Sequence, residues 1–333
     1  MFLPSAKSIA QSDSLKIDSL KRILGSYKQD TTRVNILNEL TRLIEKTIFT
    51  KGDAINNFDL PELPQAYTYS NEAIILAHKL SFPKGEEKAY SCLGLYYAFK
   101  SNNSAYINSL REAQKISMTL NENDHTSDYY IKIGEAYRNV GRDAEALKEL
   151  LSGLRIMEDT HNYFGMAYAT WLVAIIYTNQ EKYAEALSYS RQCLNLSQSL
   201  RLGNYIAPAS NVLGDVYYHT GDYDSALKYH SAAIKIWHDS SSVNSSGYNW
   251  IGAASYGTIG NIYEKQAQLY QNLGIQSKAK ESYKTALENY LVSLSEFKKI
   301  NRTDGMSQAY TNLVTSIVSR VKQIRQDIIL KKV

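Results

Sequence analysis

Apolar residues recur along this chain at spacings of three and four, the pattern of helices that bury one face. Within that pattern a short motif repeats: an apolar residue, a small residue, any two residues and a tyrosine. The small residue falls at positions 94, 134, 174 and 214, a step of 40 each time, and then at 260. A fixed period of this length is typical of helical repeat proteins. The five copies are Leu93–Tyr97, Ile133–Tyr137, Val173–Tyr177, Leu213–Tyr217 and Ile259–Tyr263.

A second set of small residues follows the motif at a fixed distance. Between the motif and this set lies a turn, where Gly141 or Gly221 can end one helix in a left-handed cap and Asp222 can begin the next. The pattern predicts helical hairpins whose helices cross where small residues let the backbones approach. Gly134 is followed in this way by Ala146 and Gly153, Ala174 by Ala186 and Cys193, and Gly214 by Ala226 and Ala233.

These motifs resemble the tetratricopeptide repeat, and the resemblance covers roughly residues 30–320. The step of 40 is longer than the family's 34 residues and is similar to members with longer helices. The resemblance implies an all-α fold: a right-handed α-α superhelix, or tetratricopeptide-like solenoid, of about six hairpins and a C-terminal capping helix. We expect one repeat domain over 30–333, with hairpins at about 31–80, 86–120, 126–159, 163–200, 203–239 and 248–299, and the cap at 303–330.

Two hairpins depart from the common length. The first has a loop from Thr50 to Pro64 that is about 13 residues longer than the others, and such a loop is either functional or disordered. In the last hairpin, the alanine that follows Gly260 is Ala279, whereas the common spacing would place it at position 272. From Gly260 to the next apolar pair, Leu313–Val314, is about 54 residues against the step of 40, so we expect each of the two helices to have grown by seven residues. Seven residues are two helical turns and leave the buried faces in register. A polar linker, 240–247, precedes this hairpin.

The N-terminal segment, residues 1–29, is open to two interpretations. Ser8 and Ala10 form the small-x-small pattern of a signal cleavage site, although the preceding residues lack a basic region and a full apolar core. One interpretation is the end of a signal peptide, with the mature chain beginning near Gln11 and the protein periplasmic or exported. The other is a disordered N-terminus on a cytoplasmic protein.

Charge and composition argue against nucleic-acid and membrane functions. The net charge is +4 with acids and bases interleaved, as in Lys278–Glu281, whereas nucleic-acid binders concentrate basic charge on one face. No run approaches the ~18 apolar residues of a membrane span. The 27 tyrosines, against 7 phenylalanines and 3 tryptophans, suit half-buried positions with one end in water. Cys92 and Cys193 are too few for a disulfide framework.

The sequence holds no motif for phosphate binding, zinc proteolysis or serine hydrolysis. Glu122 and His125 have a metal-ligand spacing, but they lie between predicted helices and the spacing has no second copy, so we interpret them as a solvated loop. His230 replaces an aromatic residue at its repeat position and is predicted to pack, partly buried. We therefore expect no enzyme, no cofactor and no metal.

The resemblance also implies where a partner binds. In tetratricopeptide-like proteins the first helix of each hairpin lines a concave face that commonly holds peptides. If the motif's small residue is position eight, positions five, nine and twelve face that groove. Asparagine there can pair with a peptide backbone, and Trp171 is either an anchor for the partner or packed against the neighbouring helix. The predicted groove residues are Glu135, Arg138, Trp171, Asn211, Asp215, Tyr218 and Asn261, and the same count places Ser91 and Leu95 on this face.

Two further segments, Asp13–Lys16 and Asp30–Leu40, resemble the sensor halves of Bacteroidetes-type two-component kinases and regulators. The resemblance implies a non-catalytic scaffold that binds a protein or peptide, as the sensing or adaptor part of a bacterial signal-transduction system. The alternative is a periplasmic helical carrier or assembly factor for a small or polymeric ligand. No nucleic-acid partner is expected, and the sequence leaves the oligomeric state open.

Overall fold

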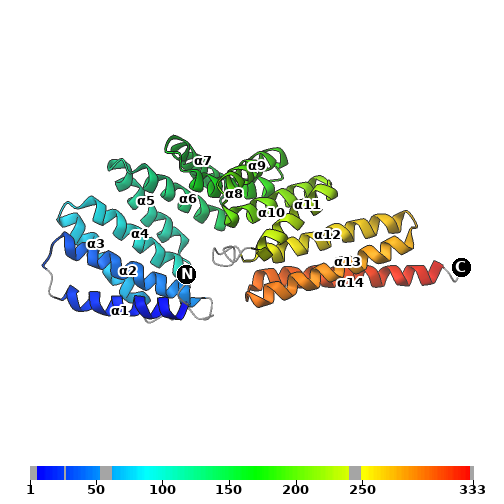
Figure 1. Cartoon of the computed structure of the whole chain (residues 1–333), viewed down its shortest axis with the longest axis horizontal. Helices are drawn as coiled ribbons and strands as arrows, with labels where there is room; N and C mark the ends of the chain where they lie inside the picture. The colour runs from blue at the N-terminus through cyan, green and yellow to red at the C-terminus, as the bar shows by residue number, and fades with distance from the viewer. Residues whose placement is uncertain (1–5, 26–27, 53–61, 240–248, 331–333) are drawn as a thin grey trace. The chain divides into compact units, whose positions relative to one another are not determined.

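The computed structural model describes residues 6–25, 28–52, 62–239 and 249–330 (Figure 1). These residues form fourteen α-helices and no β-strand, so the predicted all-α fold class is confirmed. No helix in these ranges combines the length and the apolar character needed to cross a bilayer. Residues 53–61 and 240–248, which hold most of the predicted long loop and polar linker, lie outside the described ranges.

The helices pair in sequence order, and two stand apart from the pairs. α1 spans Ala6–Leu24 and α14 spans Thr303–Leu330. Between them lie the hairpins α2/α3 (Thr31–Gly52 and Leu63–Lys79), α4/α5 (Pro83–Phe99 and Asn103–Thr119), α6/α7 (Asn123–Asn139 and Asp143–Asp159), α8/α9 (Tyr163–Asn179 and Tyr183–Ser199), α10/α11 (Gly203–Thr220 and Tyr223–Asp239) and α12/α13 (Ile251–Asn272 and Gln276–Lys299).

Helix α1 lies in the segment that the sequence left open between the end of a signal peptide and a disordered N-terminus, and its described part is helical. It packs on α2 and is tied to it by two ion pairs. Asp13 Oδ2 lies 2.8 Å from Lys46 Nζ, and Lys16 Nζ lies 2.7 Å from Glu39 Oε1. The N-terminal segment thus extends the helical stack from Ala6 onward.

Two compact units make up the chain, Met1–Gly165 and Met166–Val333. Unit 1 holds α1 to α7, and unit 2 holds α9 to α14 with all but the first three residues of α8. Each unit has apolar clusters of its own. One in unit 1 joins Val34, Leu37 and Leu76, and one in unit 2 joins Tyr290, Leu294 and Phe297 with their neighbours.

The same turn ends every helix from α3 to α10. A residue with left-handed backbone follows each of these helices, at every twentieth position of the chain. After α3 to α9 the next amide also reaches back five residues, as when Asn102 N donates to Tyr97 O at 2.9 Å, which is a Schellman turn. Turns within and between hairpins are therefore alike, and the predicted caps at Gly141 and Gly221 are confirmed. The left-handed residues are Ser81, Ser101, Asn121, Gly141, His161, Glu181, Arg201 and Gly221.

The motif's small residue lies where the two helices of a hairpin cross. A Cβ added to Gly134 would lie 2.7 Å from Leu150 Cγ, and one added to Gly214 would lie 2.6 Å from His230 Cδ2. The partner follows its glycine at the same distance along the chain in both hairpins. Only hydrogen at these positions leaves room for a large side chain on the opposite helix, which explains the small residue in the motif.

The lengthened hairpin α12/α13 preserves this crossing. α12 continues from Gly260 to Asn272, whereas α6 continues only from Gly134 to Asn139. Tyr290 packs on Gly260, so the partner of the glycine lies fourteen positions later in the chain than the common spacing would place it. Between the crossing and the turn each helix has gained seven residues, as predicted, so the turn lies two helical turns further from the crossing.

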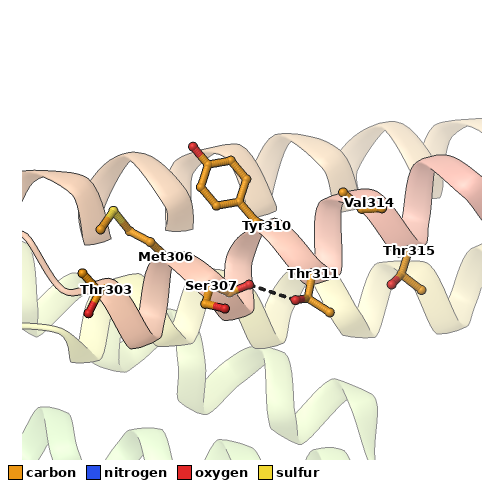
Figure 2. A pocket seen from close by; sticks show the side chains of 7 residues that line it. All are labelled: Thr303, Met306, Ser307, Tyr310, Thr311, Val314 and Thr315. Carbon is orange, nitrogen blue, oxygen red and sulfur yellow. Dashed lines mark hydrogen bonds between the residues drawn. The ribbon is translucent and has the colours of Figure 1, made fainter.

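Helix α14 lies against α12 and α13 with part of its apolar stripe. Leu313 is 8% exposed, whereas Ile317 and Val321 are 50% and 59% exposed. A shallow hollow along this helix is lined by Met306, Tyr310 and polar neighbours (Figure 2). Much of the apolar stripe of α14 therefore remains accessible in the described residues.

Candidate functional site

A hollow of about 660 Å³ lies in unit 1 on the first helices of three successive hairpins. We call it the α2–α4–α6 groove. Each helix contributes residues spaced three or four apart, which is one helical face. The lining residues are Asn35, Asn38, Glu39, Arg42 and Glu45 on α2, Glu87, Lys88, Ser91, Cys92 and Leu95 on α4, and His125, Asp128, Tyr129 and Lys132 on α6.

On α2, an arginine and a glutamate of the lining bind each other. Arg42 donates from Nε to Glu39 Oε2 and from Nη2 to Glu39 Oε1, both at 2.8 Å. Lys16 of α1 donates to the same carboxylate at 2.7 Å. The hydrogen bond from Arg42 is the main reason that the pKa of Glu39 falls to about 2. This end of the groove is therefore an ion-pair cluster that stays charged across the physiological pH range.

On α4, Glu87 forms a polar link to α6. It is 1% exposed, and its Oε1 accepts a 2.8 Å hydrogen bond from the Tyr129 hydroxyl. His125 Nδ1 lies 3.0 Å from the same oxygen. Glu87 Oε2 has no hydrogen-bond partner in the part of the chain that the structure describes. One carboxyl oxygen of Glu87 thus links α4 to α6, and the other has no hydrogen-bond partner among the described residues.

Glu45, one turn along α2 from Arg42, lies deeper in the fold. It is 4% exposed, and neither carboxyl oxygen has a hydrogen-bond partner among the described residues. Burial raises the pKa of Glu45 to about 9, so the group is protonated and uncharged near neutral pH. Buried polar groups are nearly always hydrogen-bonded in native proteins, so this carboxyl stands out as a candidate for ligand binding.

Three acid and imidazole groups at the edge of the groove come close enough to suggest a metal site. Glu87, Glu122 and His125 have ligand atoms within 4.8 Å of one another. Glu122 also binds Lys84 at 2.6 Å, and its Oε2 lies 2.9 Å from His125 Nδ1. Close polar contacts and the Lys84 ion pair connect the three groups, and His125 lies in the first turn of α6 instead of the solvated loop that the sequence suggested.

Two of the seven predicted groove residues lie in unit 1. Glu135 and Arg138 continue the α6 face beyond Lys132, and both are half-buried. Arg138 Nη2 donates to Asn139 Oδ1 at 3.0 Å. Ser91 and Leu95, placed on the same face by the sequence, line the hollow itself.

The polar groove residues of unit 2 bond one first helix to the next. Asn211 Nδ2 on α10 donates to Ser255 Oγ on α12 at 3.1 Å, and Thr258 Oγ1 donates to Asp215 Oδ1 at 3.3 Å. Asn312 Nδ2 on α14 donates to Asn261 Oδ1 at 3.3 Å. These side chains therefore have structural partners already, unlike Glu45. Burial raises the pKa of Asp215 to about 7.

The two predicted aromatic groove residues differ in accessibility. Trp171 is 5% exposed, and its ring stacks on Tyr168 with centroids 5.8 Å apart. This burial fits the alternative in which Trp171 packs within the helices. Tyr218 is half-buried, and its ring lies 6.1 Å from that of Tyr223.

The sequence did not indicate the most unusual residues of the groove. Asn38, Glu45 and Glu87 lie outside positions five, nine and twelve of the motif, and α2 has no copy of the motif from which to count. A glutamate amid the buried apolar residues of α2, such as Leu43 and Ile44, was the available signal. Both cysteines are free and buried, and burial raises their pKa values, so neither is poised as a nucleophile.

Stacked helical hairpins of this kind define the protein's class as an all-α helical repeat. Residues 165–238 match the family model described as tetratricopeptide repeat. No curated protein matches the chain. The repeat architecture inferred from the motif is thus found independently in part of unit 2.

Solved structures share the fold at low sequence identity. BtubC (BKLC) from P. vanneervenii is 17% identical with a TM-score of 0.58, over 70% of this chain and 91% of that one. The apo form of the quorum sensor NprR from B. thuringiensis is 15% identical with a TM-score of 0.57, over 93% of this chain and 83% of that one. The putative kinesin light chain repeats of Podosopora anserina are 14% identical with a TM-score of 0.50, over 65% of this chain and all of that one. At such identities the likeness concerns the fold alone.

Proposed function

We propose that this chain is a non-catalytic scaffold that binds a peptide, or a peptide segment of a partner protein, in the α2–α4–α6 groove. The observation that carries the proposal is the set of buried oxygens in this groove that lack partners among the described residues, on Glu45, Asn38 and Glu87. In unit 2 the polar groove residues Asn211, Asp215 and Asn261 bond to side chains of neighbouring helices. A groove whose polar groups are left open, over a hollow of ligand size, is suited to binding.

We further propose that this binding serves a bacterial sensing or adaptor role. The support is the resemblance of Asp13–Lys16 and Asp30–Leu40 to sensor regions, together with the fold shared with a protein described as a quorum sensor. Neither the family match nor the similar structures point to an enzyme family.

The proposal is tested by blocking the groove and capturing partners. Ser91, half-buried in the lining, is replaced by tryptophan, which fills the hollow. Ser152 on α7 is equally half-buried but is not part of the lining, so Ser152→Trp is the matched control. Bait protein is mixed with host extract, and bound proteins and peptides are identified by mass spectrometry. We expect one peptide or protein to bind the wild type and Ser152→Trp but not Ser91→Trp; equal capture by all three would place binding elsewhere.

A further inference from the structure

Glu45 is the feature of the α2–α4–α6 groove that the fold itself does not explain. Its carboxyl is buried, lines the hollow, and has no hydrogen-bond partner within the described ranges. A carboxyl in such surroundings destabilises the folded state unless another group compensates. Buried Leu43 and Ile44 precede it and buried Ile48 follows one turn later, so leucine or methionine would fit the buried face better.

Other open atoms around the hollow are of the same kind. Asn38 uses its Nδ2 to donate to Gly85 O at 2.9 Å, and its Oδ1 is without a partner in the described structure. Glu87 Oε1 accepts a hydrogen bond from the Tyr129 hydroxyl, and Glu87 Oε2 is likewise without a partner in the described structure. The unsatisfied buried atoms that the described lining presents are therefore all oxygens. The protonated Glu45 carboxyl has one O–H of its own, and once that proton leaves, all of these oxygens can only accept, so a ligand that brings hydrogen-bond donors fits them.

In the described structure the basic residues of the lining do not bond to the unpartnered carboxyl of Glu45. Arg42 is bound to Glu39. Lys132 Nζ lies 5.7 Å from the centre of the Tyr129 ring, and Lys88 is exposed. Neither lysine bonds to Glu45, whose two oxygens are without partners in the described ranges. Both lysines line the groove, where they can meet the carbonyl or carboxylate oxygens of a bound chain.

We propose that the α2–α4–α6 groove selects a lysine or arginine side chain of its peptide, and that Glu45, aided by Asn38 and Glu87, receives the cationic group. This inference rests on the proposed function and specifies its ligand. An ammonium group has three donors, a guanidinium has five, and neither has an acceptor, which matches a wall of open oxygens. The aliphatic stem of either residue can lie along Leu95 and Cys92, which line the same hollow.

The charge state of Glu45 agrees with this assignment. Burial holds its pKa at about 9 in the free protein, so the group is neutral and can stay buried before a ligand arrives. A cation beside it favours the carboxylate, and the resulting charged pair is stronger than a neutral hydrogen bond. A small diamine offers the same cationic chemistry, but it has no oxygen for Lys88 and Lys132, which would repel it.

The test is a selection of random dodecapeptides displayed on phage, run in parallel on three proteins. The wild type is compared with Glu45→Gln, which keeps the shape of the protonated acid. The matched control is Glu112→Gln on α5, where the side chain is 46% exposed and pairs only with Lys115 among the described residues. Circular dichroism confirms that each variant is folded.

We expect the wild type and Glu112→Gln to enrich peptides with lysine or arginine at one fixed position, and Glu45→Gln to lose that preference. A peptide so selected should bind Glu45→Gln at least tenfold more weakly. Acetylation of its lysine, or citrulline in place of its arginine, should weaken binding to the wild type at least tenfold, with little further effect on Glu45→Gln.

The alternative outcomes separate this inference from the proposed function. Enrichment of peptides without a fixed basic residue would leave the proposed function standing and overturn the inference. The same is true if Glu45→Gln selects the same basic position as the wild type. If no peptide is enriched, the proposed function fails. Calorimetric titration with 1,4-diaminobutane then tests whether the groove recognises a cationic group at all. Binding that depends on Glu45 would support recognition of a small amine, and no binding would overturn cation recognition altogether.

Discussion

His230 lies over Gly214 in the α10/α11 crossing, at the position that leucine occupies in the α6/α7 crossing. The imidazole is fully buried, and neither ring nitrogen has a hydrogen-bond partner within the residues described. Burial lowers the pKa of His230 to about 3, so the ring is neutral at pH 7. The nearest acid, Asp215, has its Oδ1 3.5 Å from Nε2. The site therefore holds an aromatic ring that fills space while its polar atoms remain unsatisfied.

We predict that His230→Leu stabilises the protein. Leu110 and Leu150 stand at this position in two other hairpins, where they face Gly94 and Gly134. Removing two buried, unsatisfied nitrogens should raise the free energy of unfolding by about 1–2 kcal/mol. Urea denaturation followed by circular dichroism measures the change. A stability equal to or below that of the wild type would mean that the imidazole has a partner after all.

Alanine at the motif glycines should test how tightly the helices cross. A Cβ on Gly134 would lie 2.7 Å from Leu150 Cγ and 3.2 Å from the backbone oxygen of Ala146, whereas a Cβ on Gly94 would lie 3.3 Å from Leu110 Cδ2. We expect Gly134→Ala to destabilise the fold by about 1–3 kcal/mol through overpacking. Gly94→Ala should change stability by less than about 1 kcal/mol, because alanine's better helix propensity offsets the tighter contact. Thermal melts of the two variants, made side by side, give the comparison.

The buried carboxyl of Glu45 predicts a pH dependence of stability. Its pKa is about 9 in the folded protein against an ordinary value of 4.5, so between these values the folded state binds more protons than the unfolded state. Stability is therefore lost as pH rises from 4.5 toward 9, by at most about 1.4 kcal/mol per pH unit from this group. Glu45→Gln should remove this contribution, so that the variant gains on the wild type as pH rises. Denaturation at pH 5, 7 and 9 measures it, and parallel curves for both proteins would contradict it.

The repeated turn predicts a stabilising glycine. Glu181 has a φ of 59°, a left-handed conformation that is unfavourable for residues with a side chain, whereas Gly141 and Gly221 hold the same place elsewhere. Glu181→Gly should raise stability by about 0.5–1 kcal/mol. Gly221→Ala is the reverse experiment: its Cβ meets nothing within 4 Å, so any loss of stability reflects backbone strain alone. Thermal melts of both should move in opposite directions.

The lengthened hairpin predicts that α12 and α13 can be shortened only together, each by seven residues. Deleting 265–271 together with 276–282 makes the spacing from Gly260 to Tyr290 equal to that from Gly134 to Leu150. We expect this double deletion to fold cooperatively. Deleting either segment alone shifts one helix by about 10 Å along its partner and should abolish the cooperative transition. Calorimetry distinguishes the three proteins.

The hairpins could be predicted because their signal is local and repeated. Gly134 and Gly214 mark crossings that the structure places as expected, and the extra length of α12/α13 was readable from the positions of Ala279 and Leu313 relative to Gly260. The signal works because a close helix crossing tolerates only small residues, whatever lies around it.

The binding surface could be predicted only in part, because it depends on which neighbours cover a position. Counting along the motif placed Ser91 on the groove, where it lies, and also Asn211, which is 5% exposed and bonded to Ser255 of α12. Glu45 escaped prediction because α2 carries no motif from which to count. Its burial depends on the packing of the surrounding helices, which a single helix pattern does not encode.

The short turns between α3 and α11 have a consequence for handling the protein. Each connection is two or three residues long, and most are fastened by a hydrogen bond across the turn, such as Arg142 N to Tyr137 O. A protease needs an extended stretch of chain to fit its cleft, and these connections cannot supply one without local unfolding. The stretch from Leu63 to Asp239 should therefore persist as a single fragment under limited digestion.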